Sequence, residues 1–147
     1  MGTGLVILIV DDEFGLAEML RELLHERHYD VLLAINGRAA MEVLHERRVD
    51  LVLTDLMMPV MDGSELTTAI RASAVHRTLP VVLMTSLPSA VSSPRELYNA
   101  VLTKPFTPDV LMTTVNAILA PPAAPKATRD DVLSNGRQHR NEPNDCV

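Results

Sequence analysis

The stretch LVLTDLMMPVMDG, residues 51–63, decides the fold that the rest of the chain must fit. It opens with Leu51-Val52-Leu53, and a branched apolar run bounded by turn residues predicts a strand buried on both faces of a parallel sheet. Asp55 then stands at the carboxyl end of that strand, the edge at which open α/β sheets bind ligands. Pro59 and Asp62-Gly63 predict a loop before the next helix. Taken alone, Asp55 could equally be a residue that caps a turn.

Strands and helices alternate along the chain around this stretch. Apolar runs predict strands at 5–10, 31–35, 50–54, 81–84 and 101–103, and helical periodicity predicts helices at 16–27, 39–47 and 65–73. A further helix of about two turns is expected from Pro94, and a last helix from Pro108, with a buried stripe of Val110, Leu111, Thr114, Val115 and Ile118. Ser64 and Thr107 are the predicted caps of the third and last helices. The alternation predicts an α/β fold with a doubly wound, five-stranded parallel sheet.

The length of 147 residues suits one domain, which we expect to span residues 1–119. After Leu119 the composition changes. Residues 120–125 are rich in proline and alanine and predict a linker, and the polar residues 126–147 predict a disordered tail.

Composition and charge exclude several classes of function. The net charge of -6 argues against direct binding to nucleic acid or to anionic membranes. No apolar run has the length of a membrane span, and the short run near the N-terminus is followed at once by acids, unlike a signal peptide. Cys146 is the single cysteine, so no disulfide framework is expected. These features favour a cytoplasmic protein.

Chemically active side chains follow four of the five predicted strands: Asp11 and Asp12, Asp55, Thr85, and Lys104. Because the carboxyl ends of parallel strands share one edge, we expect these side chains to lie close together. Crowded carboxylates favour a hard divalent cation, and Mg²⁺ prefers carboxylate and phosphoryl oxygens. The pattern therefore predicts that Asp55 is an acyl-phosphate nucleophile, with Lys104 and Thr85 donating to the phosphoryl oxygens. Each residue alone has a plainer interpretation: an acidic helix start, a turn hydroxyl or a surface lysine.

Together, Asp11-Asp12, the DLMMPVMDG run, Thr85 and Lys104-Pro105-Phe106 resemble the receiver domain of two-component response regulators, of the chemotaxis-regulator kind. The resemblance covers residues 4–119 and implies a flavodoxin-like (βα)₅ fold. It also implies roles for individual residues: Asp55 as phosphoacceptor, Asp11 and Asp12 as Mg²⁺ ligands beside Asp55, Met57 as a further ligand through its backbone carbonyl, Thr85 as switch hydroxyl, and Lys104 as the phosphate-contacting lysine.

The same resemblance implies how such a protein works. The phosphoryl group would come from a phosphohistidine of a sensor kinase or a histidine phosphotransfer protein, in a Mg²⁺-dependent reaction. The chain would catalyse only its own phosphorylation and dephosphorylation, and is not otherwise expected to be an enzyme. It would signal by contact with an unknown output protein, and relatives often form homodimers through the fourth helix, fifth strand and fifth helix.

Two departures keep alternatives open. Receivers usually carry an aromatic residue three positions before the lysine, where this chain has Val101, and the interval from Thr85 to Lys104 is short for the family. A degenerate receiver that binds partners without phosphorylation is therefore the main alternative. A haloacid-dehalogenase-type phosphatase would need a second acid where Met57 stands. A flavin-binding module would need a phosphate loop where Asp11-Asp12-Glu13 stands.

Overall fold

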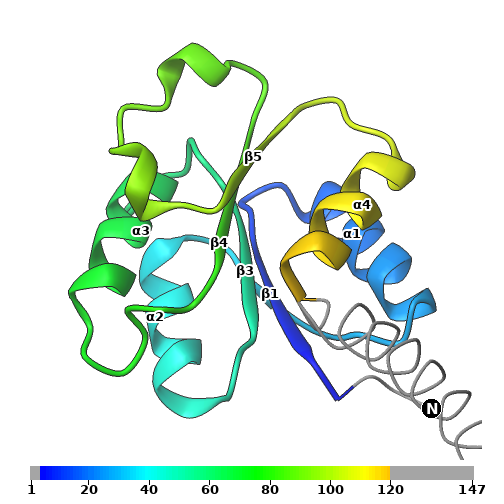
Figure 1. Ribbon diagram of the computed structural model, residues 1–147, viewed down its shortest axis with the longest axis horizontal. Helices are drawn as coiled ribbons and strands as arrows, with labels where there is room; N and C mark the ends of the chain where they lie inside the picture. The colour runs from blue at the N-terminus through cyan, green and yellow to red at the C-terminus, as the bar shows by residue number, and fades with distance from the viewer. Residues whose placement is uncertain (1–3, 120–147) are drawn as a thin grey trace, which may run out of the picture.

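The computed structural model describes residues 4–119, so the predicted linker and tail lie outside the described residues. Over the described residues the chain forms five strands, four α-helices and two single-turn 3₁₀ helices (Figure 1). Their bounds are β1 Val6–Val10, α1 Phe14–Glu26, β2 Asp30–Ala34, α2 Gly37–Glu46, β3 Leu51–Asp55, α3 Gly63–Ala72, β4 Val81–Thr85, η1 Pro88–Ala90, η2 Arg95–Leu97, β5 Ala100–Thr103 and α4 Pro108–Leu119.

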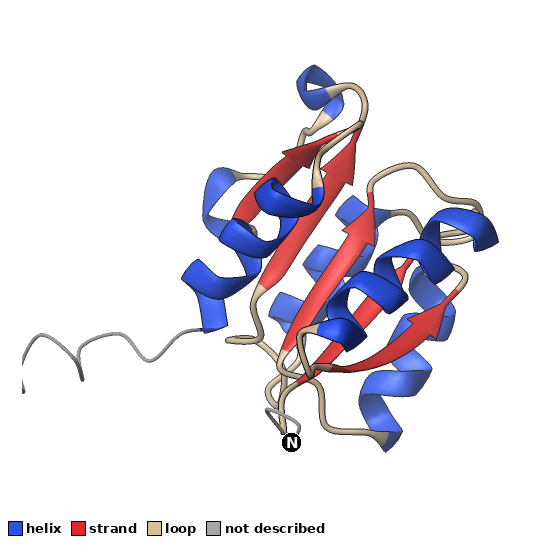
Figure 2. Cartoon of the chain, turned by 90° about the vertical axis from the view of Figure 1, so that its right-hand side faces the viewer, coloured by secondary structure: helices blue, strands red, loops and turns tan. Residues whose placement is uncertain are grey.

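All five strands pair in parallel in a single sheet, in the order β2-β1-β3-β4-β5 (Figure 2). This is the flavodoxin-like order, in which the chain reverses direction across the sheet after β2. The register pairs Ile7 with Leu51 and Asp55 with Met84. The predicted doubly wound, five-stranded parallel sheet is therefore confirmed.

Two apolar cores lie on the two faces of the sheet. Helices α1 and α4 cover one face, and α2 and α3 cover the other (Figure 1). Successive residues of a strand point to opposite faces, so Ile7 and Ile9 join the first core while Leu8 and Val10 join the second. The continuous apolar runs of β1 and β3 are the consequence, because both strands are covered on both sides.

Of the two predicted N-terminal helix caps, one is confirmed and the other is wrong. Thr107 caps α4, since its hydroxyl accepts a hydrogen bond from the backbone N–H of Val110 at 3.2 Å. Ser64 does not cap α3. The helix begins at Gly63, two residues before the predicted start, and is capped by Asp62, whose carboxylate accepts from the N–H of Glu65 at 2.8 Å while the Glu65 side chain accepts from the N–H of Asp62. This reciprocal capping box satisfies two N–H groups that a serine cap would leave to solvent.

The buried stripe of α4 is rotated from the predicted one. Leu111 and Val115 are buried as expected, but Met112 takes the place of Val110, whose side chain is 47% exposed. The rotation follows from packing against α1 and β5, which hydrophobic spacing along a short helix does not determine.

The helix expected from Pro94 is replaced by the two 3₁₀ turns η1 and η2. Pro88 and Pro94 have no backbone N–H, and proline disfavours helical conformation in the residue before it. The connection from β4 to β5 therefore spans residues 86–99 without an α-helix. No helix among residues 4–119 combines the length and the apolar character that crossing a membrane requires.

Candidate functional site

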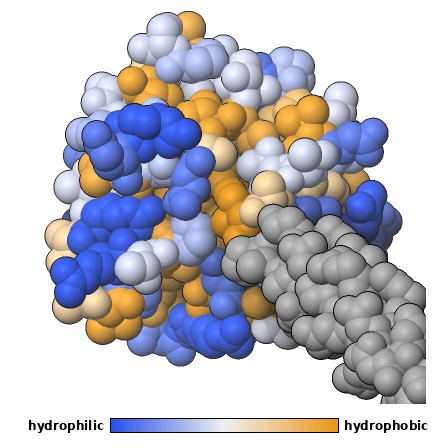
Figure 3. All heavy atoms as spheres, viewed as in Figure 1, coloured by the Kyte–Doolittle hydropathy of each residue, from blue (hydrophilic) through white to orange (hydrophobic). Residues whose placement is uncertain are grey.

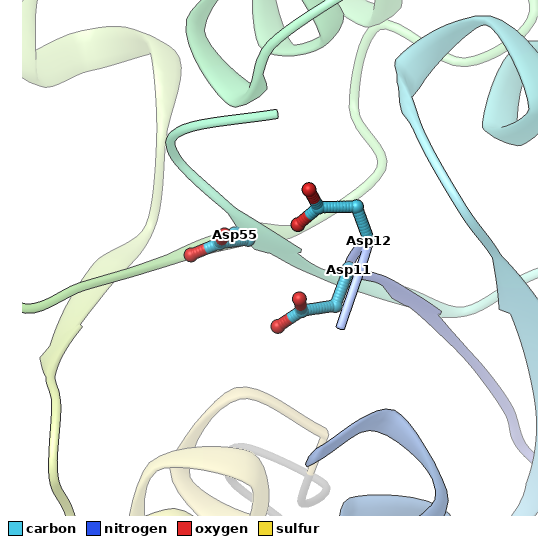
Figure 4. Close-up of side chains that lie close together, drawn as sticks. All are labelled: Asp11, Asp12 and Asp55. Atoms are coloured by element: carbon cyan, nitrogen blue, oxygen red, sulfur yellow. The ribbon is translucent and has the colours of Figure 1, made fainter. Parts of the chain in front are cut away.

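Three carboxylates meet at the carboxyl edge of the sheet. Asp11 and Asp12 follow β1, and Asp55 is the last residue of β3, its neighbour in the sheet. Each offers one oxygen, and these oxygens all lie within 4.8 Å of one another. Figure 4 shows Asp11 and Asp12 reaching from the end of β1 toward the side of the sheet where Asp55 lies. The predicted gathering of these acids at one edge is thus what the fold produces.

Asp11 is the most deeply buried of the three and is fixed by its own backbone. Its side chain accepts a hydrogen bond from the N–H of Glu13 at 2.9 Å, and its own N–H donates to the carbonyl of Ala34. Asp12, in contrast, is exposed. A buried acid held by a local turn beside an exposed one gives the cluster one rigid and one adjustable carboxylate.

Lys104 ties the acids of two strands together. The residue follows β5, and its ammonium group donates to Asp55 Oδ1 at 2.9 Å and to Asp11 Oδ2 at 3.4 Å. Its backbone N–H also donates to the carbonyl of Thr85 at 2.8 Å. Both the backbone and the side chain of Lys104 therefore contact residues of the site.

Burial raises the pKa of the Asp55 carboxyl, and the charges of Asp11 and Asp12 raise it further, although the hydrogen bond and charge of Lys104 act the other way. Burial by itself would lower the pKa of Lys104. Its hydrogen bond to Asp55 and the charges of Asp11 and Asp55 outweigh that effect, so the pKa of the ammonium group ends above the ordinary value of a lysine. The ionised site holds more negative charge than one lysine can neutralise.

A divalent cation fits that imbalance. The cluster supplies three carboxylate oxygens, the donors that Mg²⁺ prefers, and one of them is exposed to solvent from which Mg²⁺ keeps several waters. Such an ion would offset the repulsion that raises the pKa of Asp55. The predicted role of the Met57 carbonyl stays a prediction, and the side chain of Met57 is 70% exposed in the loop after β3.

Thr85 is buried at the end of β4, next to the residue that pairs with Asp55. Its hydroxyl oxygen accepts a hydrogen bond from the N–H of Leu87 at 3.0 Å. The hydroxyl is thus hydrogen-bonded to the start of the β4–β5 connection, a local contact that no sequence pattern indicated.

The loop after β3 is wedged between its neighbours. Val60 has a φ of 71°, and the N–H of Met61 donates to the carbonyl of Pro59 at 2.8 Å. Residues 59–61 therefore form a γ-turn with a positive central φ, which is the rarer and more strained of the two γ-turn types. The carbonyl of Met61 accepts from the N–H of Gly37 at 3.0 Å. A Cβ atom on Gly63 would lie 2.4 Å from the carbonyl oxygen of Asp55. The Asp62-Gly63 pair predicted a loop from the sequence, but neither of these close approaches could be predicted from it.

An apolar groove of about 490 Å³ opens beside Lys104, between α1 and the loop before α4. It is lined by Leu16, Met19, Leu20, Leu23, Ser86, Lys104, Pro105, Phe106 and Pro108. Apolar side chains also interrupt the hydrophilic surface on the face shown in Figure 3, where the β4–β5 connection and the loop before α4 lie. The charged site is therefore bordered by surface on which a protein could pack.

Val101, at the position where the resemblance led us to expect an aromatic ring, is half-buried in β5 and packs on the core beneath α2 and α3, as Tyr98 and Val91 do. The aromatic ring nearest to this position in the chain is thus Tyr98, which lies under the guanidinium of Arg95 at 5.1 Å.

Comparison with curated proteins gives relatives over most of the chain. The transcriptional regulatory protein GlrR of Escherichia coli is 33% identical over 133 residues, 87% of this chain and 30% of its own length. The DNA-binding response regulator MtrA of Mycobacterium tuberculosis is 35% identical over 116 residues, 77% of this chain and 50% of its own length. The chain thus spans half or less of these relatives.

Solved structures match over nearly their whole length. A response regulator from Chloroflexus aurantiacus has a TM-score of 0.74 at 34% identity, covering 79% of this chain and 98% of that one. The chemotaxis response regulator CheY4 of Vibrio cholerae has a TM-score of 0.70 at 29% identity, covering 80% and 100%.

A third structure is the receiver domain of the sensor histidine kinase PA1611 of Pseudomonas aeruginosa, with a magnesium ion in its active-site cleft. It has a TM-score of 0.71 at 28% identity and covers 81% of this chain and 100% of that one. Residues 7–116 match the response regulator receiver domain family. With the acids and lysine at the sheet edge where the fold places them, the chain belongs to the response regulator receiver domains of two-component signalling.

Proposed function

We propose that this protein is a phosphorylation-dependent receiver that takes a phosphoryl group onto Asp55 from a phosphohistidine of a sensor kinase or histidine phosphotransfer protein. The observation that carries the proposal is the position of the Asp55 carboxylate. It lies within reach of two further carboxylates and 2.9 Å from the ammonium group of Lys104, at the ligand-binding edge of the sheet.

In this reaction a carboxylate oxygen of Asp55 attacks phosphorus, and an O–P bond forms as the N–P bond of the phosphohistidine breaks. The electron pair of the broken bond stays on the imidazole. Lys104 would move its contact from Asp55 to a phosphoryl oxygen, and the Thr85 hydroxyl would donate to another. Mg²⁺, held by Asp11, Asp12, Asp55 and the Met57 carbonyl, would supply positive charge against the incoming phosphoryl group.

The chain would catalyse only its own phosphorylation and dephosphorylation. Asp55 is the sole group among the described residues to which we assign a covalent step, and the reaction consumes it until the acyl phosphate is hydrolysed. The setting we propose is the cytoplasm, where sensor kinases make phosphohistidine from ATP.

The donor protein would approach across the apolar groove, because Lys104 lines both the groove and the site. A helix that carries the phosphohistidine would pack its apolar face against Leu16, Met19 and Leu23 and present the imidazole to Asp55. Output would go to a further protein. A homodimer through β5 and α4 is also proposed, with the exposed Val110 on its surface, although the fourth helix expected there is replaced by η1 and η2.

The test is the intact mass of the protein after incubation with acetyl phosphate, with and without Mg²⁺. We expect a single phosphoryl adduct that requires Mg²⁺ and is absent from Asp55→Asn. The matched control is Asp109→Asn, an exposed acid in the first turn of α4, which should be phosphorylated like the unchanged protein. A folded protein that binds Mg²⁺ but never gains the adduct would instead be the degenerate receiver that acts by binding alone.

A further inference from the structure

The β4–β5 connection is held very differently at its two ends. Its second half lies against α3, where Arg71 Nε donates to the carbonyl of Leu97 at 2.8 Å and Nη2 lies 3.4 Å from Asn99 Oδ1. Asn99 Oδ1 also accepts from the N–H of Val81 at 2.9 Å, and its own N–H donates to the carbonyl of Val81. Residues 95–99 are therefore fastened to both α3 and β4.

Arg71 also holds the loop that leads into β4. Its Nη1 donates to the carbonyls of Arg77 at 3.0 Å and of Leu79 at 2.7 Å. All of these acceptors are neutral, and burial lowers the pKa of the guanidinium. A planar guanidinium whose donors reach two separate segments from α3 is a rigid cross-link, which a flexible lysine could not reproduce.

The first half of the connection has a single polar tether. Within residues 4–119, the bond from the N–H of Leu87 to the Thr85 hydroxyl is the hydrogen bond that links residues 86–91 to the rest of the fold. The bonds of Ala90 and Val91 to Leu87 and Pro88 close the turn η1 on itself. Leu87 is 59% exposed, and Val91 alone packs partly into the core. Figures 1 and 2 show η1 standing beyond the strand ends, and Figure 1 shows η2 beside α3.

We propose that Arg71 is a clamp that confines the response to phosphorylation to residues 86–91. The inference rests on the proposed function, in which the Thr85 hydroxyl turns to a phosphoryl oxygen on Asp55. That turn takes the acceptor away from the N–H of Leu87 and frees η1, while Arg71 and Asn99 keep residues 95–99 and the start of β5 in place. The phosphorylation-sensitive surface is then η1 with Leu87, and Val101 in β5 has no part in it.

Amide hydrogen exchange, resolved by residue, tests the clamp on protein treated with acetyl phosphate and Mg²⁺. The intact mass of the same sample reports the adduct. On phosphorylation we expect the amides of Leu87, Ala90 and Val91 to exchange about five- to tenfold faster, the loss expected for one hydrogen bond. The amides of Leu97 and Asn99 should change less than about twofold. In Arg71→Met, which keeps the aliphatic stem, the acceleration should spread to Leu97 and Asn99.

Variants at Thr85 and Asn99 complete the test. Thr85→Val should already exchange fast at Leu87 without phosphate, whereas Thr85→Ser should behave like the unchanged protein. Asn99→Ala removes one acceptor of the clamp and replaces Arg71→Met if that variant does not fold. An adduct with unchanged exchange at Leu87, or with equal acceleration from 86 to 99, would overturn the clamp and leave the proposed function intact. Absence of the adduct would overturn both.

Discussion

Two segments leave the same edge of the sheet, and the fold holds them in opposite ways. The loop after β3, which follows Asp55, is wedged by Gly37 on one side and by Gly63 beneath it, and a capping box closes its end. The connection after β4 is held at its start by one hydrogen bond to the Thr85 hydroxyl, and it is fixed to α3 only at its far end, through Arg71. The difference separates two tasks: the reactive carboxylate is kept in one geometry, and the segment that reports its state remains free to move.

Among the variants that test this difference, Gly63→Ala should lower the free energy of unfolding the most. The new Cβ would lie 2.4 Å from the carbonyl oxygen of Asp55 and 3.0 Å from Leu56 Cα, and both are backbone atoms that no side-chain rotation can relieve. We expect a loss of about 3 kcal/mol or more in the free energy of unfolding, measured by urea denaturation.

The matched control is Gly15→Ala, near the start of α1, where a Cβ meets no atom within 4 Å. This variant should gain about 0.5 kcal/mol, since alanine suits a helix better than glycine. Equal midpoints for the two variants would show that the loop after β3 can shift, and the contrast between the segments would then fail.

Gly37→Ala should rank second. Its Cβ would lie 2.6 Å from Met61 Cγ and 2.8 Å from the Met61 carbonyl oxygen. The side chain of Met61 can rotate away but its carbonyl cannot, so we expect a loss of about 1–2 kcal/mol. Because the strain falls on the loop that carries Met57, Mg²⁺ affinity measured by calorimetry should fall too. An unchanged Mg²⁺ affinity in the destabilised variant would show that strain between Gly37 and Met61 does not reach the metal site.

The strands and the acidic site could be predicted from the sequence, but the way in which the two segments are held could not. The strands could be predicted because strands covered on both faces must be apolar throughout, and their parallel pairing in a doubly wound sheet followed from the alternation with helices. The acids and Lys104 could be placed at one edge because each follows a strand. No feature of the fold other than its parallel sheet was needed for that step.

What could not be predicted depends on groups that sequence patterns do not show. The acceptors of Arg71 are mostly backbone carbonyls, and the tether of Leu87 is an N–H, which every residue except proline has. The choice of Asp62 over Ser64 as the cap depended on which residue began α3, a boundary that two good caps in one short stretch leave open. The rotation of α4 that buries Met112 depended on its neighbours.

Val60→Gly tests the strain on the wedged side and should act in the opposite direction. A β-branched residue at a φ of 71° costs about 1–3 kcal/mol. Glycine removes that cost, but it gives the unfolded chain more backbone entropy, which offsets part of the gain. Since Val60 is 70% exposed, little burial is lost. We expect a net gain of about 1 kcal/mol by urea denaturation, with a smaller gain for Val60→Asn, a residue that tolerates this region. A loss in both variants would mean that the γ-turn is not strained.

The smallest effect concerns the charge of Asp55, the residue from which the loop after β3 leaves the sheet. Since the pKa of Asp55 is raised in the folded protein, the folded state favours its protonated form, and stability is lost as the pH rises through that pKa. Asp55→Asn, which carries no such charge, should therefore match the unchanged protein near pH 3 and exceed it at pH 7, in the presence of EDTA. Because Lys104 pairs with Asp55 and solvent screens the site, the gain should stay below about 1 kcal/mol. Mg²⁺ at pH 7 should reduce or reverse the difference, because the ion stabilises only the protein that keeps all three acids. If Asp55→Asn is more stable by the same amount at every pH, the gain comes from packing. The repulsion among the three acids would then not destabilise the folded protein.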